Sequence, residues 1–407
     1  MWLYVDRVLI AHQQADAAAR DIPRGNLSDL YPSWLASREL LLNRRDPYSR
    51  ELTREIQTGY YGRTLDPARK NDPKNQQAFA YPVYVAFLLS PTVKLPFAEV
   101  QIIFRWLLAA LTVMSVILWL RVVRWQQSFS SGFIVVLLVF STFPVVQGIK
   151  MQQLSLLVAP LVAGCIYLLF KSKLVPAGIF LALAMIKPQL ALPLAGWLVL
   201  WSLSRPHLRW KFAVSFAVTM LFLVRGGEFL LPGWGHEFAN ALKSYLDYNV
   251  TRTLIDELFT RTVALPIELL LAAIVAVLSW RSRKAPVDSE RDDFFWVTSL
   301  VLAATVVIIP TIAPYNQLLL LPGAFLLLRT WSQPQPQTLL ARIFRGTTAG
   351  CVIWSWITAT ALAPASFLTP SAQRLWQIPL WTSVLLPLPL TASLIAQFFP
   401  TRSTNRS

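Results

Sequence analysis

Two stretches decide the fold: VQIIFRWLLAALTVMSVILWL at 100–120 and FFWVTSLVLAATVVIIP at 294–310. Each is almost continuously apolar and reaches the ~17–25 residues that an α-helix needs to cross a bilayer. Similar stretches recur through the rest of this chain of 407 residues, which is 55% hydrophobic and 14% charged. Soluble domains carry roughly 25% charged residues. The sequence therefore predicts an all-α polytopic membrane protein.

The apolar runs predict about 11 transmembrane segments, at 99–120, 131–147, 153–170, 174–187, 190–203, 211–224, 262–280, 294–311, 316–329, 346–364 and 376–399. Two hydrophilic regions interrupt this pattern. The chain then divides into an N-terminal loop region, the first half of a helical bundle, a second loop and the second half of the bundle, at 1–97, 98–224, 225–261 and 262–407.

Positive charge is distributed unevenly between the two sides of this predicted bundle. The connections on one side, together with the C-terminal tail, contain 16 Lys and Arg, whereas the four short connections on the other side contain three. Cytoplasmic loops carry the excess of Lys and Arg, so both large polar regions are predicted to be extracytoplasmic. The net charge of +16 is thus a topology signal. We expect membrane lipids as partners, and no nucleic acid.

The N-terminal region has three notable segments. MWLYVDRVLIA at 1–11 is too short to span, and because 1–97 is placed outside, we expect a further membrane-spanning helix before it. PSWLASRELLLNRR at 32–45 places Trp34, Leu35, Leu41 and Leu42 on one face, which favours a helix lying on the membrane surface. FAYPVYVAFLLSP at 79–91 is apolar but short, and we interpret it as half-inserted or interfacial.

Several kinds of chemistry have no motif here. The sequence contains no GxxxxGK[ST] phosphate loop, no GxGxxG turn and no GxSxG elbow, and its three histidines form no HExxH site. Cys165 and Cys351 both fall inside predicted spans, so neither a disulfide nor a metal site is indicated. We expect no cofactor and no metal.

The acidic residues point to the loops. No Asp or Glu occurs between Glu99 and Glu228, which argues against a proton-coupled transporter, since such proteins place acids within their spans. A catalytic carboxylate would therefore lie in an extracytoplasmic loop, and Asp29 is the leading candidate. Ser28 or Asp29 could equally cap the helix that follows, with Pro32 in its first turn. Asp46, in RRDPY, is interpreted as a turn residue.

Lys187 is the second candidate. It lies in KPQ at 187–189, a proline-containing break between two short apolar segments. This break is predicted to lie on the extracytoplasmic side, as Asp29 does. Broken spans with polar residues at the break usually line a cavity. The alternative is a lysine that snorkels from a helix end toward the headgroups. The residues alone leave both alternatives open.

Four pieces of the sequence resemble glycosyltransferase family 87, the polyprenyl-phosphate-mannose-dependent mannosyltransferase group with the GT-C fold. They are DLYPSWLASRELLLNRRDPYS, FAYPVYVAFLLSP, QGIKMQQLSLL and AGIFLALAMIKPQLALP, at 29–49, 79–91, 147–157 and 177–193. The resemblance implies a GT-C-like bundle that moves mannose or a similar hexose from a polyprenyl-phosphate donor to a lipid or glycan acceptor. It also implies an active site on the extracytoplasmic side of the plasma (inner) membrane.

The same resemblance implies a set of site residues. Asp29 corresponds to the catalytic base of the first extracytoplasmic loop. The expected substrate-binding residues are Tyr31, Arg38, Tyr81, Gln153, Lys187, Gln189, Asn316 and Gln317. The sequence departs from the family at IAPYNQLLLLP, 312–322, where many members carry a histidine and this chain has Tyr315, Asn316 and Gln317.

The chemistry of these residue types suits sugar transfer. A single carboxylate can accept the proton of an acceptor hydroxyl, and a lysine can stabilise charge that develops on a phosphate leaving group. Two alternatives stay open. An oligosaccharide ligase or polymerase would transfer a whole lipid-linked glycan, and a lipid or solute transporter, or an inactive scaffold, would transfer no sugar at all.

Overall fold

The computed structural model describes residues 1–19, 28–66, 68–125, 128–248, 252–288, 292–331, 339–369 and 374–398. In these ranges every regular element is a helix, which confirms the all-α prediction for this part of the chain. The first half contains α1 (Trp2–Tyr4), the π-helical η1 (Val5–Ile10), α2 (Ala11–Ala19), α3 (Leu30–Asn43), α4 (Arg50–Tyr61), α5 (Val85–Leu89), the 3₁₀ turn η2 (Ser90–Thr92), α6 (Phe97–Val122), α7 (Phe129–Phe140), α8 (Phe143–Lys150), α9 (Ser155–Phe170), α10 (Leu174–Ala184) and α11 (Pro188–Leu203).

The remaining elements complete the bundle. They are α12 (Pro206–Leu230), α13 (Trp234–Tyr248), α14 (Leu254–Leu258), α15 (Arg261–Ser282), α16 (Asp293–Ile308), the 3₁₀ helix η3 (Pro314–Leu320), α17 (Leu321–Trp331), α18 (Leu339–Leu368), α19 (Gln377–Leu385) and α20 (Pro387–Ala396).

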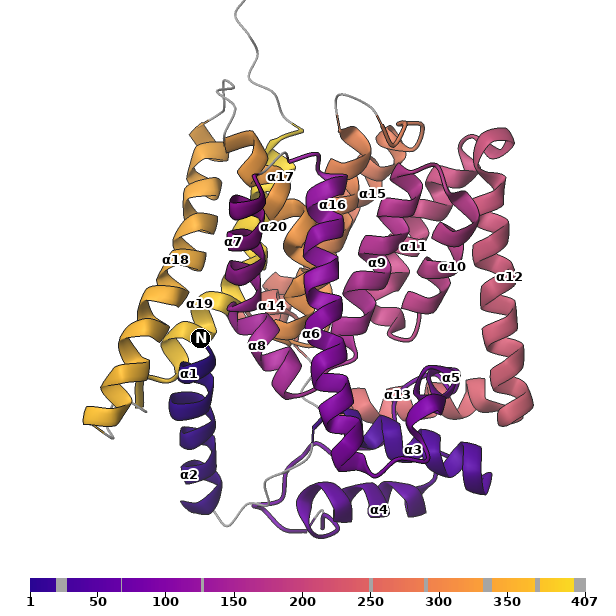
Figure 1. The fold of residues 1–407 in the computed structure, drawn as a ribbon, viewed down its shortest axis with the longest axis vertical. Helices are drawn as coiled ribbons and strands as arrows, with labels where there is room; N and C mark the ends of the chain where they lie inside the picture. The colour runs from indigo at the N-terminus through magenta and orange to yellow at the C-terminus, as the bar shows by residue number, and fades with distance from the viewer. Residues whose placement is uncertain are drawn as a thin grey trace, which may run out of the picture.

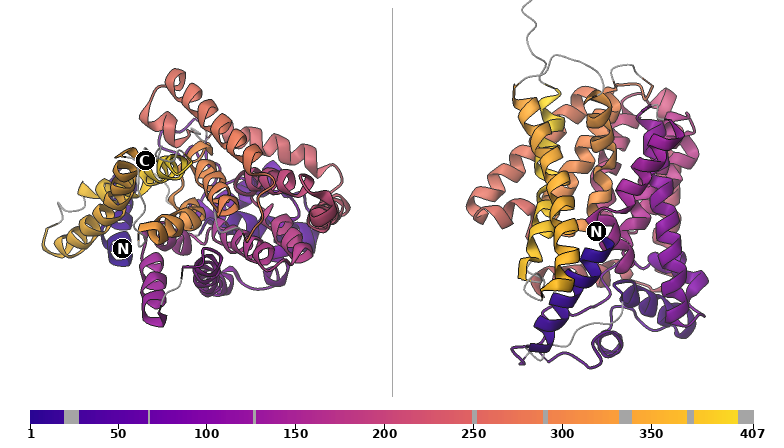
Figure 2. Two further views of the ribbon diagram at one scale, coloured as in Figure 1. Left: turned by 90° about the horizontal axis from the view of Figure 1, so that it is seen from above. Right: turned by 60° about the vertical axis from the view of Figure 1, so that its left-hand side comes forward.

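The longer helices run side by side along the long axis of the molecule, and α3, α4, α5 and α13 gather at one end (Figure 1). We call this the loop end. The opposite end, where α6 and α9 finish, carries Arg121, Arg124 and Lys171, and we call it the basic end. Figure 2 shows the same bundle from above and from the side, with the N-terminal helix beside α18. The N-terminal helix also contacts the start of α19, where the Tyr4 hydroxyl donates a hydrogen bond to the Trp376 carbonyl.

The number of full-length spans differs from the prediction. Among the described residues, five helical stretches are long and apolar enough to cross a membrane: α6, α12, α15, α18 and the pair α19–α20. A sixth is obtained if α7 and α8, which are bent by 60° at their junction, count as one broken span. The helices α9, α10, α11 and α16 are apolar but have only 10–17 residues. The predicted count of about 11 is therefore not confirmed, because several predicted segments form helices too short to span and the segment at 131–147 is bent next to Pro144.

The described residues of the second polar region are mostly helical. α12 continues to Leu230, and α13 begins only a few residues later. Trp234, at the start of α13, is buried and packs edge-on against Tyr84, which fixes this helix to α5. The short α14 begins with a capping box between Thr253 and Asp256. Aromatic anchoring and capping thus order a segment whose polarity alone suggested a loop.

The helix predicted at 32–45 is present as α3, its inner face is set by contacts within the protein, and its position on the membrane surface stays a prediction. Leu42 is exposed, whereas Ser33 and Ser37 are buried. The reason is tertiary: α3 packs against α5 and η2, and the Trp34 indole donates to the Thr92 carbonyl at 3.2 Å. The neighbouring stretch 79–91 contains the short α5, of five residues, and the start of η2, so it does not form a span.

Candidate active site

The turn between α8 and α9 builds the centre of the site. Gln152 has a left-handed backbone (φ 52°), and the next N–H, of Gln153, donates to the Gly148 carbonyl at 2.9 Å. This six-residue closure is the Schellman type of helix ending. The turn also holds the first loop, because the Asp29 N–H donates to the Met151 carbonyl at 3.0 Å. Two segments far apart in sequence therefore meet through their backbones.

Asp29 stands at the N-cap position of α3, yet its side chain makes no capping hydrogen bond in the described structure. Its carboxylate accepts hydrogen bonds from the Gln153 amide and, at 3.4 Å, from the Tyr60 hydroxyl. Burial raises the pKa of Asp29 above its ordinary value, and the charge of Lys187 and the two hydrogen bonds only partly oppose this. The capping interpretation is thus not supported, because the carboxylate turns toward the α8–α9 turn.

Lys187 is the cationic counterpart. It precedes Pro188, and a residue before proline is restricted to extended conformations; its ψ of 83° breaks the chain between α10 and α11. The side chain is 6% exposed. Its ammonium donates to Gln153 Oε1 at 3.1 Å and to Ser155 Oγ at 2.9 Å. This geometry contradicts snorkelling, because the charge points into a polar network.

Gln153 separates the two charges. Its amide nitrogen faces the Asp29 carboxylate and its oxygen faces the Lys187 ammonium, an orientation that both charges favour. Among the described contacts, Asp29 and Lys187 form no direct salt bridge, and a single amide group spans the space between them. The carboxylate keeps free lone pairs, and the ammonium, with three donors, keeps one that neither Gln153 nor Ser155 uses.

Aromatic rings and η3 enclose Lys187. The ammonium lies 5.6 Å from the ring centres of both Tyr81 and Tyr315. A Cβ added at Gly148 would lie only 3.1 Å from the Cβ of Tyr315, so glycine permits this close approach of η3 to α8. The next residue, Asn316, accepts a hydrogen bond from Ser155 at 2.8 Å. The network therefore runs from Asp29 through Gln153, Lys187 and Ser155 to η3.

Five of the nine predicted site residues thus belong to one contact network: Asp29, Tyr81, Gln153, Lys187 and Asn316. The other four lie elsewhere. Tyr31 and Arg38 are both on α3. Tyr31 packs edge-on against Phe97, and the Arg38 guanidinium lies 5.4 Å from the centre of the Trp34 ring. Gln317 donates to the Ser383 carbonyl at 2.9 Å.

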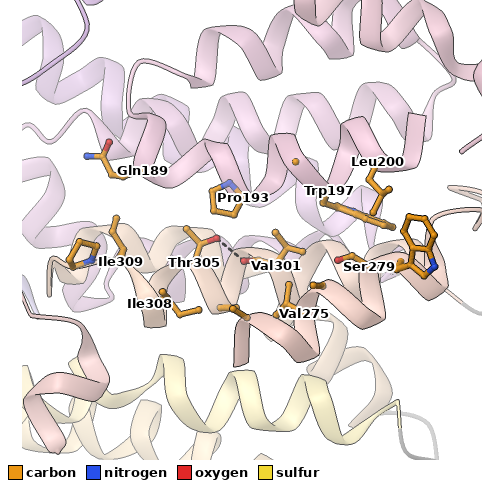
Figure 3. Close-up of a pocket in the computed structure, with 16 residues that line it drawn as sticks. Gln189, Pro193, Trp197, Leu200, Val275, Ser279, Val301, Thr305, Ile308 and Ile309 are labelled. Carbon is orange, nitrogen blue, oxygen red and sulfur yellow. Dashed lines mark hydrogen bonds between the residues drawn. The ribbon is translucent and has the colours of Figure 1, made fainter. Parts of the chain in front are cut away.

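The fourth, Gln189, is exposed and lines an apolar pocket between α11, α15 and α16 with a volume of about 620 Å³. Figure 3 shows Gln189 at one end of this pocket, Pro193 near its middle, and Trp197 with Ser279 toward the other end. Gln189 follows Lys187 by two residues at the start of α11. The pocket therefore begins close to the polar network and extends along α11 into apolar surroundings.

Three contributors were missed from the sequence. The ring of Tyr315, in η3, lies beside the Lys187 ammonium, and the sequence had marked Tyr315 only as a departure from the family. Tyr60, in α4, bonds to Asp29, and Ser155, in α9, links Lys187 to Asn316. Ser155 lies two residues after Gln153 in QGIKMQQLSLL, so this motif could have identified it as a site residue. Tyr60 had no comparable signal, because nothing local shows that α4 folds back on the start of α3.

The described residues contain no group of three or more His, Cys, Asp or Glu placed to hold a metal ion. The polar network instead offers a carboxylate, an ammonium, amides and hydroxyls, which can bind a phosphorylated, hydroxyl-rich molecule and move a proton.

Comparison with known protein families identifies glycosyltransferase family 87. The model of glycosyltransferase family 87 matches residues 79–353, which is more than half of the chain. No curated protein and no solved structure matches. The matched part contains Gln153, Lys187 and Asn316, whereas Asp29 precedes it and joins it through the contacts described above. The chain therefore belongs to glycosyltransferase family 87, and it is a multi-pass membrane glycosyltransferase.

Proposed function

We propose that the chain moves a single hexose, mannose or a similar sugar, from a polyprenyl-phosphate donor to an extracytoplasmic lipid or glycan hydroxyl, at the site between Asp29 and Lys187. The observation that carries this proposal is the placement of a base and a cation on the two sides of one amide, that of Gln153. A sugar phosphate can then contact the cation while the acceptor hydroxyl contacts the base. We place the site outside the plasma (inner) membrane, because the basic excess lies at the other end of the bundle.

The proposed step is a single displacement at the anomeric carbon. The acceptor oxygen forms a bond to this carbon as the bond from carbon to the phosphate oxygen breaks, and the phosphate leaves with the bonding pair. Asp29 takes the hydroxyl proton. Lys187, held by Gln153 and Ser155, uses its remaining donor to stabilise negative charge on the departing phosphate.

The apolar pocket beside Gln189 suits the rest of the donor. A phosphate at Lys187 would place its isoprenoid chain near the start of this pocket, whose lining residues are almost all apolar. Pockets of ~300–1,000 Å³ with mostly apolar walls are typical of sites for small ligands. The pocket therefore supports a lipid-linked donor.

The test is transfer by the purified protein in liposomes, with a panel of radiolabelled polyprenyl-phosphate sugars and a mixed lipid and glycan acceptor pool. We expect transfer of one sugar from one member of the panel, loss of transfer in Asp29→Asn, and retention in Asp46→Asn. Asp46 is a matched control, because it lies in the same loop and its carboxylate accepts from the Tyr48 N–H at 2.9 Å, a turn that asparagine also forms. Transfer of a preassembled glycan would indicate a ligase, and uptake without transfer would indicate a transporter.

A further inference from the structure

A second large cavity lies at the basic end, far from the network of Asp29. It has a volume of about 1,250 Å³, is open on one side and is lined mainly by α6, α7 and α9. Its walls are mostly apolar, with Ile117, Phe133 and Leu137 among them, whereas Arg121, Arg124 and Lys171 line its polar end. The sugar-transfer proposal uses none of these residues.

The three cations line the same cavity, and none of them forms a salt bridge with a described residue. The Arg124 guanidinium lies 5.2 Å from the Phe170 ring centre, and the Lys171 ammonium lies 5.3 Å from the same ring, so their charges repel each other. No acidic residue occurs among the described residues that line this cavity. Arg124 donates one hydrogen bond to the Asp288 carbonyl, at 3.0 Å, and its guanidinium has further donors. An anion between the three side chains would relieve the repulsion.

The N-terminus of α7 adds to the positive electrostatic potential of the three cations. Ser128 caps the helix by accepting from the Ser131 N–H, and it also lines the cavity. The N-terminus of α7 therefore points its positive dipole end toward the same region as the cations. Farther along α7, Gly132 lines the cavity, and a Cβ added there would meet no atom within 4 Å. The space beside Gly132 can thus hold an apolar chain.

We propose that this cavity binds one anionic phospholipid, with its phosphate between Arg121, Arg124 and Lys171 and an acyl chain along α6 and α7 past Gly132. A soluble phosphate would satisfy the cations but would leave the apolar walls uncovered, which favours a lipid. Basic pockets between transmembrane helices bind anionic headgroups by this combination of charge and apolar contact. The proposal is independent of the sugar-transfer reaction.

The test uses the full chain in detergent, with native mass spectrometry to count retained phosphatidylglycerol or phosphatidylcholine of identical acyl chains. We expect the parent to retain phosphatidylglycerol in preference, and Arg121→Gln/Lys171→Gln to weaken this binding on the order of 30-fold. The control Arg281→Gln/Arg342→Gln makes the same charge change at exposed positions on α15 and α18, and it should bind as the parent does. Equal retention of the two lipids by the parent, or an equal loss in both double variants, would overturn the proposal.

A second pair of variants tests the acyl chain without changing charge. Gly132→Trp fills the space along α7 and should lower the retention of phosphatidylglycerol at least several-fold. Gly350→Trp, on α18, places the same side chain at another open, exposed position and should have no effect. Normal retention by Gly132→Trp would show that the chain does not occupy this cavity. Because both variants keep all three cations, this result does not depend on how the charge variants fold.

Discussion

Lys187, near the loop end, and Lys171, at the basic end, have similar aromatic surroundings but differ in burial and in hydrogen bonding. Each ammonium lies over two rings: Lys187 is 5.6 Å from Tyr81 and Tyr315, and Lys171 is 5.8 Å from Tyr167 and 5.3 Å from Phe170. Lys187 is buried and bonded to Gln153 and Ser155. Lys171 is exposed at the mouth of a lipid-sized cavity.

The comparison teaches that ring contacts alone do not define a role. A cation over an aromatic ring gains about 0.5–1 kcal/mol when exposed and about 2 kcal/mol or more when desolvated. What differs is the polar network, which fixes the Lys187 ammonium at one point and links it to Asp29. A fixed cation suits a reacting phosphate, whereas an exposed cation suits a lipid that exchanges with the bilayer.

The largest contrast we expect is an all-or-none difference in accessibility. Cysteines introduced at Thr58 and Ser244, both exposed at the loop end, should react in intact cells with a membrane-impermeant reagent, and one at Ser282 should not. Ser37, in the same loop, is unsuitable because it is buried. A Cys351→Ala background removes the partly exposed native thiol. Labelling at position 282 would place the two lysines on the opposite sides from those proposed.

The next largest effect is expected for Asp29→Asn. Loss of a general base lowers turnover by about 10²–10⁴, while the backbone bond to Met151, which needs no carboxylate, should keep the fold. Turnover and donor binding should be measured together, because the variant is expected to bind donor and fail to transfer. Near-parental transfer would assign Asp29 a structural role.

Removal of the Lys187 charge should have a slightly smaller effect. Lys187→Met keeps the length of the side chain, and loss of one preorganised electrostatic group costs about 10²–10³ in turnover. Arg281→Gln, which removes an exposed cation outside both sites, should transfer at the parental rate. If the turnover of Lys187→Met equals that of the parent, the donor phosphate does not need the fixed cation. The difference between Lys187 and Lys171 would then not reflect different functions.

The smallest effect is a displacement of the pH profile. The base must be deprotonated, so transfer is lost as pH falls through the pKa of Asp29, and burial places this acid limb above the ordinary aspartate value of about 3.9. Lys187 lowers the pKa of Asp29, so Lys187→Met should move the limb to still higher pH in its residual activity. A limb that stays in place would mean that the two groups do not interact electrostatically.

The sequence by itself determined the helical class and the membrane character, and it predicted which end of the bundle is cytoplasmic. These follow from apolar run length and from the distribution of Lys and Arg, which depend on the bilayer and not on which helices touch. It also indicated two site residues. Asp29 was indicated because acidic residues are confined to particular segments, and Lys187 because KPQ breaks an apolar stretch. Neither signal says how the two side chains are oriented.

Only the tertiary structure decided which residues share a site. Gln153 lies between Asp29 and Lys187 because the backbone of Asp29 docks on the α8–α9 turn, a contact across more than a hundred residues that has no local signature. The same long-range packing turned Ser37 of α3 inward and folded Tyr60 back to Asp29. Helical periodicity and hydropathy report local preference, whereas orientation and burial are set by the neighbours that the fold supplies.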